Sequence, residues 1–163
     1  MVSAWDQNAA LYACSPASAI IEEVAGAWVK ELLDLPREAS FAFTTGCQMA
    51  HMTALAAARH AVLANSGWSV EEDGLFGAPP IKVYATGNRH GSVDRALRYL
   101  GLGRNCVHLV ETDQLGRMSS AALARDLARH DGPAILALNA ADLNVGRVVQ
   151  SIRNASNLLL NIN

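Results

Sequence analysis

The chain has 163 residues and a formal net charge of −2, from 13 lysines and arginines against 15 aspartates and glutamates. Apolar residues make up 51% of the sequence and charged residues 17%, whereas an ordinary soluble domain has about 25% charged residues. This composition excludes disordered, collagen-like and disulfide-rich chains. No apolar run approaches the roughly 20 residues of a membrane span, and the basic patch of a nucleic-acid binder is missing. We therefore expect one globular domain of α/β or helical type.

The first residues and the cysteines indicate a cellular compartment. The N-terminus has no basic region followed by an apolar stretch, so no secretory signal is expected. The three cysteines, Cys14, Cys47 and Cys106, are odd in number and far apart in the chain. They predict free thiols in a reducing environment, and we therefore expect a cytoplasmic protein.

The predicted elements alternate between helices and strands along the chain. Ser15 and Pro16 are typical of the N-cap and first position of a helix, whose apolar spacing continues to Leu35 before Pro36. Residues 68–80 contain two glycines and two prolines and predict a loop. The other predicted elements are strand 41–43, helix 47–63, strand 81–85, helix 92–100, strand 107–110, helix 120–129 and strand 134–138. This alternation favours an α/β fold with a mainly parallel sheet and covering helices.

The turn between Phe43 and Cys47 is the most informative local feature. A strand is predicted to end there, and a helix begins directly after Thr45-Gly46. Such a turn directs unpaired backbone N–H groups and the positive end of a helix dipole at one point, which suits a phosphate. Gly46 lets the backbone come close, and the Thr45 hydroxyl and Gln48 amide are further donors. A plain strand-to-helix turn accounts for the same residues, because neither a Walker loop nor a GxGxxG pattern is present.

Cys47 supports a second hypothesis for the same turn. A thiol on a sharp strand-to-helix turn is the nucleophile of hydrolases that carry a G-x-C-x-G sequence. In this chain Met49 stands where that pattern has its second glycine. A thiol-dependent hydrolase that uses Cys47 therefore stays open as an alternative function.

His90 is the second candidate for chemistry. It lies between the predicted strand 81–85 and the predicted helix 92–100, and ligands of open parallel sheets bind at the carboxyl ends of strands. Its ring can stack on an aromatic cofactor or act as an acid or base, whereas a histidine that only packs at a helix start is the simpler interpretation. His51 and His60 lie nine residues apart on one predicted helix, and the chain has no CxxC or HExxH pattern, so no metal site is expected.

The sequence changes character after Gly146. Residues 147–163 are rich in asparagine and show no clear helix caps or strand pattern. Asn154-Ala155-Ser156 matches a glycosylation sequon, but without a secretory signal a poorly ordered tail is the simpler interpretation. We therefore expect one domain over residues 1–146 and an atypical C-terminal tail over residues 147–163.

Four stretches of the chain carry a resemblance that no single motif would show. They are residues 15–36 (SPASAIIEEVAGAWVKELLDLP), 41–63 (FAFTTGCQMAHMTALAAARHAVL), 73–103 (DGLFGAPPIKVYATGNRHGSVDRALRYLGLG) and 110–127 (VETDQLGRMSSAALARDL). In order and spacing, from about Trp5 to Gly146, the chain resembles the group II pyridoxal-phosphate-dependent decarboxylases. That family includes the aromatic-amino-acid and glutamate decarboxylases. The resemblance implies pyridoxal 5'-phosphate as cofactor and part of a fold-type I, aminotransferase-like large domain.

The resemblance also implies roles for particular residues. The implied cofactor-binding positions are Gly46, Cys47, Gln48, His90 and Asn144. The first three fall on the loop that holds the cofactor phosphate, and His90 is the residue that stacks on the pyridine ring, which makes it the candidate catalytic residue. Asn144 falls at a strand end beside the cofactor, where the neighbouring Val145 replaces the family's hydroxyl residue. The implied substrate-binding positions are Ser15, Pro16 and Ala17.

Two functional groups of the family have no counterpart in these 163 residues. The family's later blocks hold an aspartate that pairs with the pyridine nitrogen, and a His-Lys pair whose lysine forms the Schiff base. The only lysines here are Lys30 and Lys82, and neither has that sequence context. We therefore expect the chain to be the truncated N-terminal part of a large domain and to be inactive alone.

The activity that the resemblance implies is α-decarboxylation of an L-amino acid to an amine with release of carbon dioxide. In the family, the substrate pocket is completed by the second subunit of a homodimer. Neither a nucleic acid nor a membrane is expected as a partner. There is a second alternative besides the hydrolase: the chain is a non-catalytic fragment or pseudoenzyme that binds a decarboxylase-like subunit through uncovered apolar surface. The small share of charged residues is consistent with this alternative.

Overall fold

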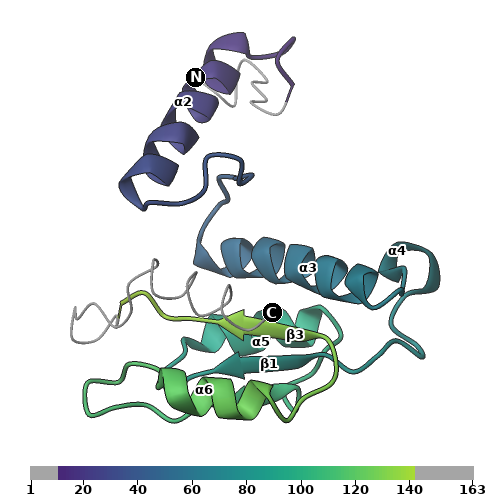
Figure 1. Cartoon of the computed structure of the whole chain (residues 1–163). Helices are drawn as coiled ribbons and strands as arrows, with labels where there is room; N and C mark the ends of the chain where they lie inside the picture. The colour runs from purple at the N-terminus through teal and green to yellow at the C-terminus, as the bar shows by residue number, and fades with distance from the viewer. Residues whose placement is uncertain (1–10, 142–163) are drawn as a thin grey trace. The chain divides into compact units, whose positions relative to one another are not determined.

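The computed structural model describes residues 11–141 of the chain (Figure 1). The helices and strands are α2 (Pro16–Leu32), α3 (Cys47–Asn65), α4 (Val70–Asp73), β1 (Lys82–Ala85), α5 (Gly91–Tyr99), β2 (Val107–Leu109), α6 (Ser120–Leu127) and β3 (Ala134–Ala137). The described residues belong to two compact units, 11–44 and 45–141. Within them, no helix has both the length and the apolar character that crossing a membrane requires. The expected tail lies outside the described residues, so the domain boundary at residue 146 stays a prediction.

Helix α2, in the first unit, begins at the predicted proline and ends before the predicted Leu35. Pro16 lies in its first turn, where a missing N–H costs no hydrogen bond. At the other end, Asp34 adopts a left-handed conformation with a φ of 55°. The N–H of Leu35 then donates to the carbonyl of Lys30 at 2.9 Å. A left-handed residue followed by such a hydrogen bond is typical of a helix C-terminus. Helix α2 therefore ends at Leu32, and the predicted continuation to Leu35 is wrong.

The segment that follows α2 is held against this helix by Lys30 and Gly26. The Lys30 ammonium donates to the carbonyls of Arg37 at 2.6 Å and Ala39 at 2.9 Å. It also lies 5.6 Å from the centre of the Phe41 ring, within reach of a cation–π contact. The same ring fills the space at Gly26, where a Cβ would collide with it. Because Phe41 is anchored on the helix and this segment joins no strand among the described residues, the strand predicted there is wrong.

The second unit, residues 45–141, is built on a parallel sheet of three strands in the order β2–β1–β3. Strand β1 lies in the middle, with Val83 opposite both Val107 of β2 and Ile135 of β3. The helices α5 and α6 lie in the connections between the strands, as crossovers between parallel strands require. The predicted parallel sheet with alternating helices is confirmed for this unit.

Alternate residues of β1 face two hydrophobic clusters on opposite sides of the sheet. Val83 packs toward α3 and α5, in a cluster that includes Leu55, Leu63, Val93 and Leu97. Tyr84 faces the other side, in a cluster that includes Val110, Met118, Ala122 and Leu123. Figure 1 shows α6 in front of the strands and α5 behind them. The sheet is therefore covered on both faces, and its ligand-accessible groups lie at the strand ends.

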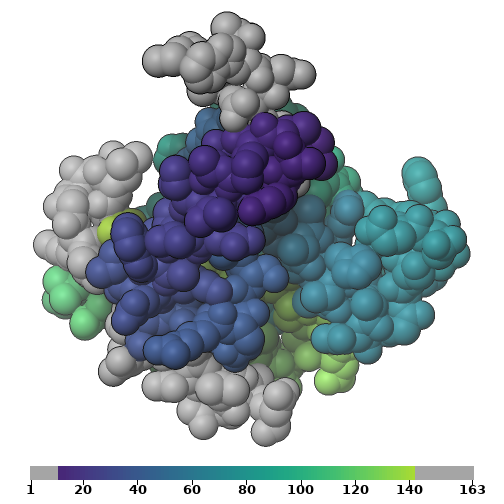
Figure 2. Space-filling model, turned by 90° about the horizontal axis from the view of Figure 1, so that it is seen from above, coloured from purple at the N-terminus to yellow at the C-terminus, as the bar shows by residue number. Residues whose placement is uncertain are grey.

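Helix α2 exposes large apolar side chains, drawn in purple to blue in Figure 2. Among them are Ile21, Trp28 and Leu32, which are 68%, 63% and 83% exposed. Single exposed apolar residues are ordinary, but several on one helix are typical of an interaction surface. We call these three residues the α2 apolar surface.

Candidate functional site

The loop that follows β1 is held in place by an ion pair. Arg89 donates through Nε and Nη2 to the two carboxylate oxygens of Asp94, at 2.8 and 3.2 Å. Its Nη1 and its backbone N–H both donate to the carbonyl of Thr86, a buried residue directly after the strand. A two-point contact between guanidinium and carboxylate fixes orientation as well as distance. The last residue of the loop, His90, is therefore presented in a defined position.

His90 stands between β1 and α5, at the carboxyl end of the central strand, as the sequence predicts. It is the N-cap of α5: its Nδ1 accepts the backbone N–H of Ser92 at 3.2 Å and lies 2.7 Å from Ser92 Oγ. The helix consequently begins at Gly91, one residue earlier than predicted. The residue is exposed, and its Nε2 has no hydrogen-bond partner in residues 11–141. One ring nitrogen is thus fixed by the protein while the other is accessible to a ligand.

The Ser92 hydroxyl joins His90 to a second histidine. Ser92 is only 3% exposed, and its Oγ lies 2.8 Å from Nδ1 of His51 in the second turn of α3. The second turn of α3 and the first turn of α5 are therefore connected through one buried hydroxyl group. Sequence reasoning missed both His51 and Ser92, because nothing in their spacing relates two residues that are 41 positions apart.

Gln48 makes a second connection between the two helices. Its Nε2 donates to the carbonyl of Ser92 at 3.3 Å, and its Oε1 accepts from Nη1 of Arg95 at 3.0 Å. One amide hydrogen is therefore already used within the protein, and the backbone N–H of Gln48 is the better candidate for a phosphate. Arg95 adds a positive charge at this place. The assignment of Gln48 to a cofactor stays a prediction.

The first turn of α3 offers backbone donors for an anion. Gly46, at the N-cap, has φ and ψ of 138° and 171°, a combination that is essentially restricted to glycine. The first helical bond runs from Ala50 N–H to the Gly46 carbonyl at 3.0 Å. The N–H groups of Cys47, Gln48 and Met49 precede that bond and have no partner inside the helix. The turn has no acidic residue, so the positive end of the helix dipole favours an anion such as phosphate at this place.

Cys47 has an exposed free thiol in the same turn. In the part of the chain that the structure describes, its sulfur has no hydrogen bond to a basic side chain. Thiol nucleophiles are activated by an adjacent base or a nearby cation. The arrangement around Cys47 therefore adds no support for the hydrolase alternative.

The remaining predicted site residues lie elsewhere. Ser15, Pro16 and Ala17 belong to the first unit, where Ser15 is buried with an Oγ that has no partner in residues 11–141, and the other two are exposed. Their assignment to a substrate pocket stays a prediction. Asn144 lies outside the described residues, and its assignment to the cofactor stays a prediction as well.

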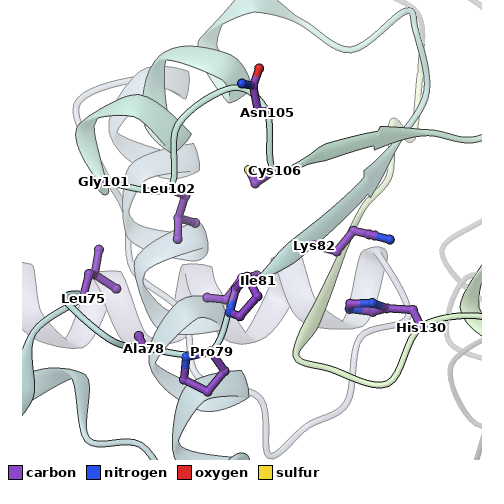
Figure 3. Close-up of a pocket in the computed structure, with 11 residues that line it drawn as sticks. Leu75, Ala78, Pro79, Ile81, Lys82, Gly101, Leu102, Asn105, Cys106 and His130 are labelled. Atoms are coloured by element: carbon purple, nitrogen blue, oxygen red, sulfur yellow. The ribbon is translucent and has the colours of Figure 1, made fainter.

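Lys30 is engaged within its own unit, and Lys82 lies at the amino end of the sheet. The Lys30 ammonium is bound to two backbone carbonyls of its own unit. Lys82 is the first residue of β1, whereas His90 follows the last, and a strand rises by roughly 3.3 Å per residue. Lys82 lines a cavity of about 460 Å³ at the amino end of the sheet, together with Ile81, Cys106 and His130 (Figure 3). This cavity is separate from the site at the carboxyl end.

A third histidine is engaged on the other face of the sheet. His108 Nε2 lies 2.9 Å from Oδ2 of Asp126, which links β2 to α6, and the His108 ring lies 5.2 Å from that of Tyr84. The hydrogen bond from His108 lowers the pKa of Asp126. Burial raises the pKa of Tyr84. No cluster of three metal-ligating side chains is found in residues 11–141. We therefore assign the pair of His108 and Asp126 a role in the stability of the fold.

The chain is similar to amino-acid decarboxylases. No family model matches it. It is 34% identical to aromatic-L-amino-acid decarboxylase of Bacillus atrophaeus over 125 residues, which are 74% of this chain and 24% of that protein. It is 28% identical to an acidic amino acid decarboxylase of Homo sapiens over 138 residues, which are 82% of this chain and 25% of that protein. The chain thus spans about a quarter of the length of the curated relatives it matches.

Solved structures of the same group share its fold. Mouse CSAD superposes with a TM-score of 0.65 and 26% identity, over 78% of this chain and 26% of that one. Oryza sativa TDC, with PLP and tryptamine, superposes with a TM-score of 0.64 and 24% identity, over 78% of this chain and 27% of that one. The predicted fold class, part of a fold-type I large domain with a parallel sheet and covering helices, is confirmed.

Proposed function

Because the chain belongs to the group II pyridoxal-phosphate-dependent decarboxylase family, we propose that it supplies the part of such an enzyme that holds the phosphate and the ring of pyridoxal 5'-phosphate. The reaction of the whole enzyme is α-decarboxylation of an L-amino acid to an amine. The observation that carries the proposal is the junction of two helix N-termini, in which Ser92 connects the donors of α3 with the exposed ring of His90.

The residues present fit the phosphate of this cofactor. The N–H groups of residues 47–49 and the dipole of a 19-residue helix offer several donors at one point, beside the charge of Arg95. Hydrogen bonds to a charged group contribute about 1.5–3 kcal/mol each. Gly46 leaves room at this turn, because within residues 11–141 no atom beyond its chain neighbours lies within 4 Å of the place where a Cβ would stand.

The residues also fit the flat ring of the cofactor. His90 is exposed, and its ring is anchored through Nδ1, so one face is available for stacking, a contact worth about 1 kcal/mol by analogy with aromatic pairs. The Arg89–Asp94 pair holds the loop that carries the ring. When bound, the cofactor draws electrons from the substrate carbon that loses its carboxylate. His90 orients that cofactor ring, and its Nε2 faces away from the hydrogen bonds that hold Nδ1.

Covalent attachment of the cofactor is not expected within this chain. The Lys30 ammonium is engaged with carbonyls, and Lys82 lies at the opposite end of β1 from the site. Borohydride reduction in the presence of pyridoxal phosphate should therefore leave both lysines without a stoichiometric adduct, as measured by mass spectrometry of the peptides. One specific adduct on Lys82 would contradict this assignment.

A titration with the cofactor tests the proposal. We expect the full chain to bind pyridoxal phosphate with a dissociation constant of about 0.1 to 1 mM, because ordering the cofactor offsets much of the contact energy. Pyridoxal without phosphate should bind at least about tenfold more weakly, the equivalent of one charge-assisted hydrogen bond. The change in cofactor absorbance is the measurement. Equal binding of the two compounds would contradict the phosphate assignment.

A variant of His90 tests the ring assignment. His90→Asn keeps a side chain that caps a helix N-terminus but removes the aromatic ring. We expect it to weaken pyridoxal phosphate binding about threefold to tenfold. The matched control is His60→Asn, at an exposed position further along α3 that pairs with Glu71 at 3.4 Å. If the two variants bind the cofactor equally well, His90 does not hold the ring.

A second candidate function is that of a non-catalytic partner. The α2 apolar surface favours it, because Trp28 is 63% and Leu32 83% exposed on one helix. In this case the chain binds a decarboxylase-like subunit, in a complex that is comparable to the homodimer of the family. Size-exclusion chromatography, alone and with a full-length relative, is the test. Co-elution that Leu32→Ser abolishes would support it, and independent elution would contradict it.

A further inference from the structure

One buried hydroxyl group faces two histidine nitrogens. Ser92 Oγ lies 2.8 Å from His51 Nδ1 and 2.7 Å from His90 Nδ1, and both distances are those of real hydrogen bonds. A hydroxyl has one proton, so it can donate to only one of the two rings. The other ring must donate its own proton to the hydroxyl oxygen.

The backbone decides which ring donates. His90 Nδ1 also accepts the N–H of Ser92 at 3.2 Å, and an amide N–H is always a donor. This nitrogen therefore carries no proton, and it needs the hydroxyl proton to avoid facing an oxygen lone pair at 2.7 Å. The hydroxyl then has only its oxygen to offer His51. His51 must donate through Nδ1.

We infer that His51 is a positioning residue, which donates Nδ1–H to Ser92 Oγ so that the hydroxyl donates to Nδ1 of His90. This order leaves the proton of the neutral His90 ring on Nε2, the exposed nitrogen. His90 therefore presents a hydrogen-bond donor to a ligand and a ring whose rotation is restrained at two points. The hydrogen bonds run in one direction, from Nδ1–H of His51 to Oγ of Ser92 and from Oγ–H of Ser92 to Nδ1 of His90, and they join α3 to α5.

The surroundings keep this order intact. Ser92 is 3% exposed, so water competes little for its hydroxyl group. Gln48 binds the carbonyl of the same residue, and the Arg89–Asp94 pair restrains the loop on the other side of His90. A chain of hydrogen bonds that passes through a buried hydroxyl group, and in which every donor has an acceptor, specifies one arrangement.

The positions of the ring protons test the inference without any ligand. The full chain, labelled with ¹⁵N in its histidine rings, is measured by NMR at about pH 8.5, roughly two units above the ordinary histidine pKa. We expect His51 to carry its proton on Nδ1 and His90 on Nε2. In Ser92→Ala, His51 loses its acceptor and should change to the Nε2–H form that free histidine favours. A proton on Nε2 of His51 in the unaltered chain, or no change in Ser92→Ala, would overturn the inference.

A second measurement separates positioning from packing, and this arm rests on the proposed function. His51→Phe removes the donor, whereas His51→Asn places an amide N–H near the position of Nδ1. We expect His51→Phe to weaken pyridoxal phosphate binding about threefold to tenfold, the equivalent of one neutral hydrogen bond. His51→Asn should restore most of this loss, and His60→Phe on the same helix is the control. Equal losses in both His51 variants would mean that the residue only packs.

The two proposals can fail separately. The expected ring protons without any cofactor binding would contradict the proposed function and leave the role of His51 intact. Cofactor binding with His51 protonated on Nε2 would contradict the role of His51 and leave the proposed function intact.

Discussion

Gly46→Ala probes the backbone on which the proposed phosphate site depends. Gly46 has a φ of 138° and a ψ of 171°, in a region that a residue with a Cβ occupies only under strain. Among the described residues, no atom beyond the chain neighbours lies within 4 Å of the place where the new Cβ would stand. The expected cost is therefore conformational and involves no collision.

The magnitude follows from two opposing terms. Holding a residue other than glycine in this region costs about 1–3 kcal/mol. Alanine also restricts the unfolded chain, which stabilises the folded state by about 0.4–1 kcal/mol. We therefore expect a net loss of about 1–2 kcal/mol in the free energy of unfolding. Where the backbone relaxes to a negative φ, the chain before residue 46 turns relative to α3, which changes access to the N–H groups of residues 47–49.

Urea denaturation and cofactor titration measure the two effects. The matched control is Gly91→Ala, in the first turn of α5, where no neighbouring atom lies within 4 Å of an added Cβ and φ is ordinary. This control should be neutral or slightly stabilising, because alanine favours a helix. Gly46→Ala should lose affinity for pyridoxal phosphate while affinity for pyridoxal stays nearly constant. If both variants unfold at the same urea concentration, the reasoning about Gly46 is refuted.

Three further outcomes are expected. Because the hydrogen bond from His108 lowers the pKa of Asp126, the ionised carboxylate stabilises the fold at pH values above its ordinary pKa of about 3.9. This contribution is lost as the pH falls through the lowered pKa. Between about pH 7 and pH 3, the urea midpoint of Asp126→Asn should therefore drop less than that of the unaltered chain. Burial raises the pKa of Cys106, so iodoacetamide should modify it more slowly than the exposed Cys47, as mass spectrometry can follow. Within residues 45–141, β2 and β3 each pair on one side only, and α2 carries its apolar surface, so the chain should associate. A concentration-independent monomer in sedimentation would contradict this.

Local sequence patterns determined the order of helices and strands in residues 45–141. Apolar runs of strand length alternate with helical spacing, and glycines separate them, so the parallel sheet and the place of His90 at the end of β1 could be predicted. The same local signals failed beside α2. Phe41 has the apolar character of a strand residue, yet its ring packs against Gly26, a contact that periodicity does not encode.

Tertiary packing alone decided how the site is connected. Helix α5 lies in the connection between β1 and β2, and α3 packs against it, which brings the second turn of α3 to the first turn of α5. Only then does Ser92 meet His51, a residue 41 positions away that has no local signal of its own. The Ser92 N–H fixes the tautomer of His90 locally, so the shared hydroxyl group leaves His51 as the donor, and this second contact exists only because two helices meet. Sequence places His90 at the strand end, and the packing of α3 on α5 decides which nitrogen of His51 carries the proton.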